Sequence, residues 1–196
     1  MKKRILVIGG TGIIGSAVAE VLEVKHEVIR ASRKGTVHVD LDDANTIHKL
    51  FGSIGKLDAI VCTAQSGKLT PWHSDHWEAD FSFGLKKLIG QIMMLRRAIT
   101  NLNDDGSVTL TSGAFKTPFP GSSVGHLVNV GLEGFVRHAA IEMPRGIRLN
   151  IVSPGWVRES LIRLGMDPTK GTLASEVARS YVEAIEGSAN GQILIP

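Results

Sequence analysis

Cysteine is almost absent from this 196-residue sequence, and long apolar runs are absent altogether. The single cysteine, Cys62, excludes an internal disulfide framework, and no cysteine–histidine cluster has zinc-finger spacing. No apolar stretch approaches the roughly 20 residues of a membrane-spanning helix. The basic start, Met1 to Arg4, is followed by four apolar residues and then glycines, which is typical of a strand and not of a signal peptide. We therefore expect a cytoplasmic protein with no membrane partner.

Strong charge of either sign is also missing. The chain has 22 lysine and arginine residues against 19 acidic ones, a net charge of +3, and the basic residues are scattered. Scattered basic charge suits a small anionic ligand as well as nucleic acid, but it forms no stripe, so we expect no nucleic-acid partner. A hydrophobic fraction of 43% is typical of a chain with a real core and not of a disordered one.

Apolar and amphipathic segments alternate along the chain. Continuous apolar runs such as residues 5–8 are typical of strands buried on both faces, whereas residues 13–22 repeat their apolar positions with the period of a helix. By the same criteria we expect further strands at residues 28–31, 37–39, 57–62, 107–110, 148–152 and 192–195. Further helices are expected at residues 42–51, 82–101, 122–143, 159–164 and 175–186, with Gly52 ending the first of these and a turn at residues 103–106.

Repeated strand–helix units predict an α/β fold of three layers. We expect a doubly wound parallel sheet of about seven strands, covered by helices on both faces and joined by right-handed crossovers, as in a Rossmann fold. The expected strand order is 3-2-1-4-5-6-7. No linker, repeat or low-complexity segment divides the chain, so residues 1–196 are expected to form one domain.

Three glycines lie between the first strand and the first helix, at Gly9, Gly12 and Gly15. Glycine lets the chain turn tightly and lets its backbone approach a pyrophosphate, whose charge is stabilised at the helix N-terminus. The alternative is a strand-to-helix turn that merely contains glycines, but this spacing in the first strand–helix unit favours a dinucleotide site. The same ligand is expected to contact the rest of the loop and the first turn of the helix, at Thr11, Ile13 and Ile14.

The residues after the second strand favour NADP(H) over NAD(H). An NAD site usually has an acid about 20 residues after the loop, which holds the ribose 2′-hydroxyl. Here residues 30–34 read Arg-Ala-Ser-Arg-Lys, and no carboxylate lies between Glu27 and Asp40. Ser32 and Arg33 are candidates to hold a 2′-phosphate, the arginine through a charge-assisted fork, and the alternative is a solvated basic loop. Asp40 caps either the adenine amino group or the following helix.

Five segments together resemble the short-chain dehydrogenase/reductase family. Residues 11–15 look like its glycine motif, residues 57–64 like its fourth-strand motif, and residues 110–113 like its fifth strand, which ends in the catalytic serine. Residues 132–135 are similar to the part of the active-site helix that follows the catalytic lysine, and residues 150–157 resemble the Pro-Gly motif beside the nicotinamide. The matches follow the family order along nearly the whole chain, so the resemblance implies the family's fold and a nicotinamide dinucleotide cofactor.

The resemblance also implies roles for individual residues. Ser112 takes the place of the catalytic serine, whose hydroxyl would polarise a substrate carbonyl, and the alternative is a strand-end serine that caps local backbone. In the fourth-strand motif Cys62 and Thr63 replace two asparagines, and the cysteine is most simply a small apolar core residue. The motifs assign cofactor contacts to Cys62, Thr63, Ala64, Pro154, Gly155, Trp156 and Val157.

The chain departs from the family at its catalytic tyrosine and lysine. Counting back from residues 132–135 puts the tyrosine at Gly125 and the lysine at Asn129. The only tyrosine, Tyr181, lies in a helix that we expect at the surface. The standard mechanism of the family therefore cannot operate unchanged.

Lys87 is expected to compensate for part of this loss. In the local pattern Lys87-Leu88-Ile89-Gly90 it occupies the position of an asparagine that completes the family's catalytic tetrad from the preceding long helix. Asparagine and lysine would then have exchanged helices, and the Lys87 ammonium would reach the cofactor ribose, Ser112 and Asn129. The alternative is a surface lysine beside Lys86.

The sequence does not decide which group replaces the tyrosine as the proton source. His126 is the titratable group nearest to Gly125, and imidazole exchanges protons near neutral pH. Because His126 is displaced from Gly125 by one residue, its side chain is turned by roughly 100° around the helix. The alternative proton source is water in the space beside Gly125. His73 and His76 are more typical of a loop that packs two tryptophans at the site entrance than of a metal site.

Together these features predict an NADP(H)-dependent oxidoreductase that acts on a small carbonyl or alcohol. The missing tyrosine leaves two alternatives: a non-catalytic dinucleotide-binding or redox-sensing protein, and a different reaction on the same fold, such as isomerisation or dehydration. We also expect a homodimer or homotetramer, because the two longest helices carry apolar residues that a monomer would partly expose. These residues are Ile92, Leu95, Leu127 and Val128.

Overall fold

The structure is a computed structural model that describes residues 1–64 and 68–196. Its strands are β1 (Arg4–Ile8), β2 (Glu27–Ser32), β3 (Val37–His38), β4 (Leu57–Cys62), β5 (Leu102–Thr111), β6 (Arg148–Val152) and β7 (Ile193–Leu194). All neighbouring strands pair in parallel, in the order β3-β2-β1-β4-β5-β6-β7. This is the predicted order. The strand numbers descend from β3 to β1 and ascend from β4 to β7, so the order of the strands reverses between β1 and β4.

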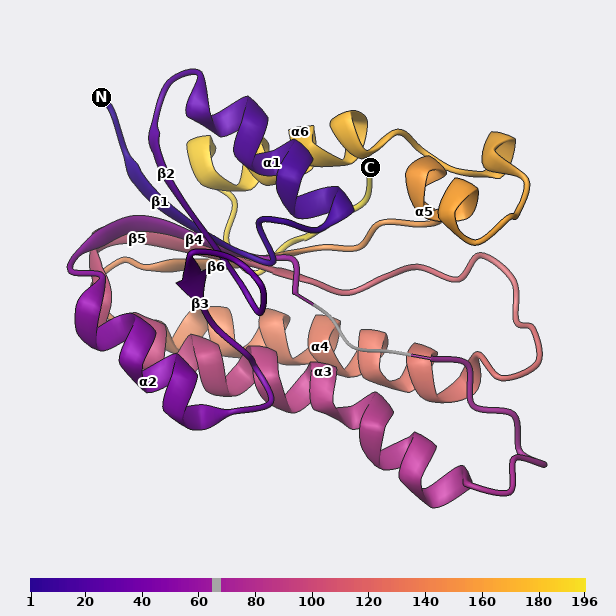
Figure 1. Ribbon diagram of the computed structural model, residues 1–196. Coiled ribbons are helices and arrows are strands. Elements are labelled where there is room, and N and C mark those ends of the chain that lie inside the picture. The colour runs from indigo at the N-terminus through magenta and orange to yellow at the C-terminus, as the bar shows by residue number, and fades with distance from the viewer. Residues whose placement is uncertain (65–67) are drawn as a thin grey trace.

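Helices cover both faces of the sheet (Figure 1). On one face lie α1 (Ile13–Glu23) and α6 (Ala174–Glu186), and on the other α2 (Ala44–Ser53), α3 (Trp77–Ala98) and α4 (Ser123–Ala139). The short helix α5 (Arg158–Arg163) follows β6 beyond the edge of these layers. Short 3-10 turns add residues 99–101, 140–142 and 168–170. The three-layer doubly wound fold is therefore confirmed.

Alternating side chains of the central strands supply two separate cores. Leu6 and Ile8 of β1 join the core under α2, α3 and α4, whereas Ile5 and Val7 join the core under α1 and α6. Every one of these four side chains is fully buried. Successive side chains of a strand point to opposite faces of the sheet. Because both faces are covered here, the strand is apolar at consecutive positions, which explains the continuous apolar runs.

Several element boundaries differ from the sequence expectation. Helix α2 continues through Gly52 to Ser53, and Gly55, with a φ of +75°, makes the turn that follows. Residues 103–106 belong to β5, where the pairing with β4 shifts register and Asp105 has a φ of +58°. Helix α3 begins five residues early, at Trp77, where stacking of the Trp77 and Phe81 rings one turn apart supports the additional turn.

Tyr181 is buried, contrary to the expectation of a surface residue. Its side chain lies in the core under α1 and α6, and its hydroxyl shares a 2.7 Å hydrogen bond with Thr111 Oγ1. Burial raises the pKa of this phenol. Because this core is on the opposite side of the sheet from α3 and α4, Tyr181 does not replace the missing tyrosine.

The exposed apolar residues of α3 and α4 are not the set that the sequence suggested. Leu95 and Val128 are each only 2% exposed, because they face the sheet. Leu127 is exposed as expected, Ile92 is partly buried, and further exposed side chains on the two helices are Ile89, Met93 and Val130.

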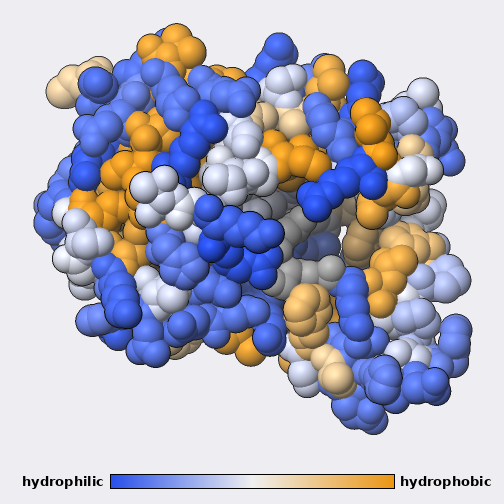
Figure 2. Space-filling model, in the orientation of Figure 1, coloured by the Kyte–Doolittle hydropathy of each residue, from blue (hydrophilic) through white to orange (hydrophobic). Residues whose placement is uncertain are grey.

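On the face in Figure 2, hydrophilic residues predominate and hydrophobic ones form separate groups. Within the described residues, no helix combines the length and apolarity that crossing a membrane requires.

Candidate active site

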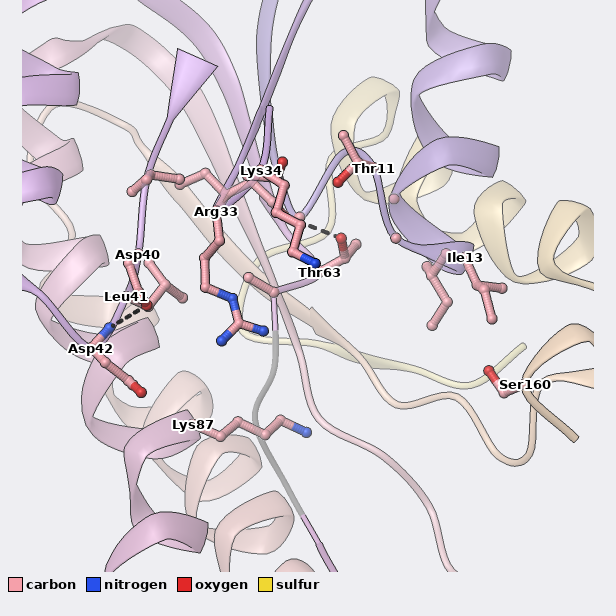
Figure 3. A pocket seen from close by; sticks show the side chains of 18 of the residues that line it. Thr11, Ile13, Arg33, Lys34, Asp40, Leu41, Asp42, Thr63, Lys87 and Ser160 are labelled. Atoms are coloured by element: carbon pink, nitrogen blue, oxygen red, sulfur yellow. Dashed lines mark hydrogen bonds between the residues drawn. The ribbon is translucent and has the colours of Figure 1, made fainter. Parts of the chain in front are cut away.

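A cavity of about 1020 Å³ opens at the carboxyl ends of β1, β2 and β4, where the strand order reverses. This is the position at which doubly wound folds bind ligands. Figure 3 shows Arg33, Lys34 and Lys87 extending into the cavity, with Ile13 and Ser160 on its other side. The lining also includes Ile8, Gly9, Thr11, Gly12, Ile14, Gly15, Ser32, Val39, Asp40, Leu41, Asp42, Thr63, Ala64, Lys86, Arg163 and Leu164.

The glycine loop is closely packed against β4. Gly9 has a φ of +84°, and a Cβ at this residue would lie 2.6 Å from the backbone nitrogen of Ala64. A Cβ at Gly15 would collide with the carbonyl of Gly9. Gly12 is the N-cap of α1 and, lacking a side chain, leaves the first amides of the helix without a side-chain acceptor. Only glycine fits this cradle, which suits the close approach of a phosphate.

The end of the cavity beside β2 is basic. Arg33 and Lys34 line it, whereas Arg30 is held outside in a fork with Glu23, at 2.7 Å for each of the two bonds. The Ser32 hydroxyl is buried and has no hydrogen-bond partner among residues 1–64 and 68–196. A buried hydroxyl of this kind favours a ligand that brings an acceptor.

Asp40 lines the cavity, and the structure excludes it as the helix cap. Its carboxylate accepts a 3.1 Å hydrogen bond from the Asp42 backbone. The N-cap of α2 is Asp43, whose side chain accepts from the Asn45 backbone at 2.9 Å. The helix-cap alternative is therefore wrong, and a contact of Asp40 with the adenine stays a prediction.

Helix α5 contributes residues that the sequence analysis did not identify. Ser160, Arg163 and Leu164 line the cavity opposite the basic end. Their spacing of three and four residues puts them on one face of the helix, and this spacing is the signal that would have identified them. Arg163 adds another positive charge to the rim.

Lys87 lies at the contact of α3 with β5 and α4. Its ammonium donates to the Ser112 carbonyl at 2.8 Å and to Asn129 Oδ1 at 2.8 Å, and its side chain lines the cavity. The residue is 8% exposed, so the alternative of a surface lysine is wrong. Burial lowers the pKa of Lys87 to about 8, and the nearby Cys62 and Glu133 oppose this fall. The contact with Ser112 runs through its carbonyl and not through its hydroxyl.

The Ser112 hydroxyl instead contacts Glu133 of α4. It donates to Glu133 Oε1 at 2.7 Å, and the Ser153 hydroxyl donates to the same oxygen at 2.7 Å. Both serines are almost fully buried. Neither Glu133 nor Ser153 was predicted from the sequence to have a role. Because Glu133 follows Asn129 by four residues, helical spacing alone would place the two on one face of α4.

A phenyl ring lies beside Gly125, where the family would have its tyrosine. A Cβ at Gly125 would lie 3.3 Å from the nearest atom of the Phe115 ring. This ring borders the space that the sequence left open to water as an alternative proton source. The Phe115 ring in turn packs near the rings of Phe119 and Trp156, at centroid distances of 5.2 and 6.4 Å.

This aromatic group borders a second cavity of about 370 Å³. His126 is exposed and lines it, and the remaining lining is Trp72, Phe115, Pro118, Phe119, Pro120, Gly121, Ser122 and Ser123. His126 does not line the larger cavity. Within residues 1–64 and 68–196, no three histidine, cysteine or acidic side chains gather as a metal site would require, His73 and His76 included.

Some expected cofactor contacts are not found at the larger cavity. Cys62 is fully buried in the core under α2, α3 and α4, and burial raises its pKa to about 12. Thr63 and Ala64, which follow it, do line the cavity. Within the described chain the segment of Pro154, Gly155, Trp156 and Val157 does not, because Trp156 packs with Phe115 and Phe119 and Val157 lies in the core.

The sheet, the glycine cradle and the cavity are together typical of dinucleotide-binding proteins. A family model described as enoyl-(acyl carrier protein) reductase matches residues 10–183, and no match was found among curated proteins. The solved structure of lin1944 from Listeria innocua is 36% identical, with a TM-score of 0.89 over 98% of each chain. The chain belongs to the short-chain dehydrogenase/reductase family.

Two further solved structures are similar along nearly the full length. One, described as a small-chain dehydrogenase, is 28% identical, with a TM-score of 0.85 over 100% of this chain and 96% of the other. Another, a small-chain dehydrogenase in complex with NADPH, is 26% identical, with a TM-score of 0.86 over 100% of this chain and 97% of the other.

Proposed function

We propose that the protein is an NADP(H)-dependent oxidoreductase that interconverts a small carbonyl compound and its alcohol. The observation that carries this proposal is the buried lysine Lys87, whose side chain lines the cavity and whose ammonium donates to Asn129 Oδ1. Burying an ammonium is costly because the charge is desolvated, so its presence here favours a site that uses positive potential. A cation near the reacting end can stabilise developing negative charge.

The residues of the cavity fit both the pyrophosphate and the 2′-phosphate of NADP(H). The glycine cradle and the N-terminus of α1 would hold the pyrophosphate, and Ser32, Arg33 and Lys34 would hold the 2′-phosphate. When bound, NADP(H) supplies or accepts the hydride. The NADPH complex of the small-chain dehydrogenase that is 26% identical supports this choice of cofactor.

Lys87 would both bind the cofactor ribose and stabilise negative charge that develops in the reaction. An ammonium has three protons, and two of them are donated to Ser112 and Asn129. The third would bind a hydroxyl of the nicotinamide ribose. A pKa of about 8 keeps the lysine mostly charged at neutral pH, so it also provides positive potential for an alkoxide in the site.

The second cavity supports an apolar substrate. Phe115 both borders this cavity and covers Gly125, so the cavity adjoins the place where the family's tyrosine would meet a substrate. Its aromatic and proline lining favours a flat apolar group attached to the reacting carbon, with His126 at the rim as a hydrogen-bonding partner. We therefore expect aromatic aldehydes or ketones, and the matching alcohols, to be better substrates than short aliphatic ones.

We also propose a homodimer or homotetramer formed through α3 and α4. Ile89, Met93, Leu127 and Val130 lie on these two helices and are each about half exposed. The same proposal includes a cytoplasmic location, where a lone unpaired thiol such as Cys62 is ordinary.

The experiment that tests the function compares cofactor binding with turnover. NADPH affinity is measured by fluorescence titration, and NADPH oxidation is followed with a panel of aromatic and aliphatic carbonyl compounds. Turnover with at least one aromatic carbonyl supports an oxidoreductase. Tight NADPH binding without turnover of any compound, in either direction, would instead favour a non-catalytic or redox-sensing protein, for which the Phe115 ring over Gly125 is the structural argument.

A further inference from the structure

We propose that Glu133 exchanges the proton of the reaction with the substrate through the Ser112 hydroxyl, and so replaces the missing tyrosine. The inference rests on the proposed function and adds a residue to it. Its geometric basis is the 2.7 Å hydrogen bond that Ser112 Oγ donates to Glu133 Oε1. Ser112 stands at the position of the family's catalytic serine, whereas Glu133 lies one helical turn beyond Asn129.

The direction of this hydrogen bond determines what Ser112 can do. A hydroxyl has one proton to donate, and here that proton is directed at the carboxylate. The oxygen's lone pairs are left to accept a hydrogen bond from a substrate hydroxyl. Ser112 therefore suits the role of a proton relay between an alcohol and Glu133 better than that of a donor to a substrate carbonyl.

The surroundings of Glu133 hold its carboxylate in a fixed position. A second hydroxyl, from Ser153 after β6, donates to the same oxygen at 2.7 Å and fixes its place. Both serines are almost fully buried, whereas Glu133 is partly exposed, so a proton that reaches the carboxylate has a path to solvent. Lys87 from α3 is close enough to Glu133 for their charges to interact, and Arg137 follows Glu133 by one turn of α4.

The proposed step balances in both directions. In alcohol oxidation, the carbinol C–H bond breaks and its hydride passes to the oxidised cofactor while the C=O bond forms. The alcohol O–H proton moves to Ser112 Oγ as the Ser112 proton moves to Glu133 Oε1. The products are the carbonyl compound, the reduced cofactor and a protonated Glu133, and the reduction is the same step in reverse.

The test uses the full-length protein with an aromatic alcohol or aldehyde that the wild type turns over. Glu133→Gln keeps the size of the side chain and its acceptor for both serines, but it cannot take up the proton. We expect it to lower kcat at least tenfold and to flatten the dependence of kcat on pH, while the Kd for NADPH changes less than twofold. Glu133→Asp is expected to restore part of the pH dependence, and Glu142→Gln, which removes an exposed carboxylate after α4, serves as the matched control.

Three outcomes count against the proposal, and they can be distinguished. A Glu133→Gln variant with the kcat and the pH profile of the wild type would show that Glu133 only links α4 to the ends of β5 and β6 through hydrogen bonds. Ser153→Ala should retain the pH profile even if its rate falls, because it removes a second donor but not the relay, and a flattened profile in that variant would also count against the relay. A wild type that binds NADPH and turns over no compound would overturn both this inference and the proposed function.

Discussion

Lys87 of α3 and Asn129 of α4 face each other across the contact of the two helices, with the ammonium 2.8 Å from the amide oxygen. By the resemblance of the surrounding motifs, each residue is predicted to occupy the position at which the family has the other type of side chain. On this interpretation the pair of a cation and an amide is retained, while its two members have exchanged helices. This relationship explains how the chain keeps a cation at the cofactor end without a lysine on α4.

The exchange predicts non-additive effects of substitution at these two positions. Asn129→Lys alone would put a second ammonium beside Lys87 in a buried space and is expected to destabilise the fold by about 2–4 kcal/mol. Lys87→Asn alone would leave the Ser112 carbonyl without its donor. The double variant restores one cation and one amide, so its loss in stability should be smaller than the sum of the single losses by at least about 1 kcal/mol. Urea unfolding of the four proteins measures this, and additive losses would contradict the pairing.

Stability should rise with pH in the range where only the unfolded chain holds the Lys87 proton. The folded-state pKa is about 8 and the ordinary value is 10.5. Between these values the unfolded chain binds more protons, so the free energy of unfolding increases with pH, by up to roughly 3 kcal/mol. At lower pH the cost of burying the charge is present in full.

The comparison with Lys87→Met isolates this effect. Cys62 and Tyr181 have pKa values raised by burial, so they lower stability at alkaline pH in both proteins. The difference in free energy of unfolding, wild type minus variant, should grow in favour of the wild type between pH 8 and pH 10. A difference that stays constant over this range would mean that Lys87 is not buried in its charged form.

Arg33 is expected to set the preference for NADP(H). Arg33→Ala should weaken NADPH binding at least tenfold and change NADH binding less than twofold, because only NADPH has the 2′-phosphate that the guanidinium would contact. Fluorescence titration with both cofactors measures the two affinities. Arg30→Met is the control, since the Arg30 side chain is already paired with Glu23 outside the cavity. Equal loss of both affinities in Arg33→Ala would refute the assignment.

The exposed apolar residues of α3 and α4 predict how assembly can be broken. Light scattering of the wild type should give two or four times the chain mass of 21.0 kDa. Replacing both Met93 and Leu127 with glutamate should reduce the mass toward that of a monomer, because charged residues oppose burial of this face. Val24→Glu, which alters an exposed residue after α1, should leave the mass unchanged. A wild type of 21.0 kDa at micromolar concentration would contradict the proposal.

Local sequence patterns predicted the sheet and the glycine cradle well. Strands β4 and β6 have the predicted boundaries, because each is mostly apolar and ends before a polar residue, Thr63 or Ser153. These features depend on spacing within one segment. The position of Lys87 also followed from the sequence, since the resemblance fixed the phase of both α3 and α4.

Features that depend on contacts between distant segments were missed. The Phe115 ring over Gly125 comes from a loop that has no periodic pattern, so nothing local predicts its direction. The contact of Glu133 with Ser112 joins α4 to β5, and it becomes visible only when the two are packed together. Tyr181 is a different case, because Val177, Tyr181 and Ile185 recur every four residues and all lie in the core, so this spacing did contain the signal.

The affinity for NADPH of Lys87→Met, compared with that of Lys86→Met, tests whether the buried ammonium holds the cofactor. Lys86 also lines the cavity, but it is half exposed and paired with Asp42, so it matches Lys87 in charge and not in burial. We predict that Lys87→Met weakens NADPH binding at least tenfold, about 1.4 kcal/mol, while Lys86→Met changes it less than twofold. Equal affinities of the wild type and Lys87→Met would contradict the account, because the buried ammonium would then not bind the cofactor ribose.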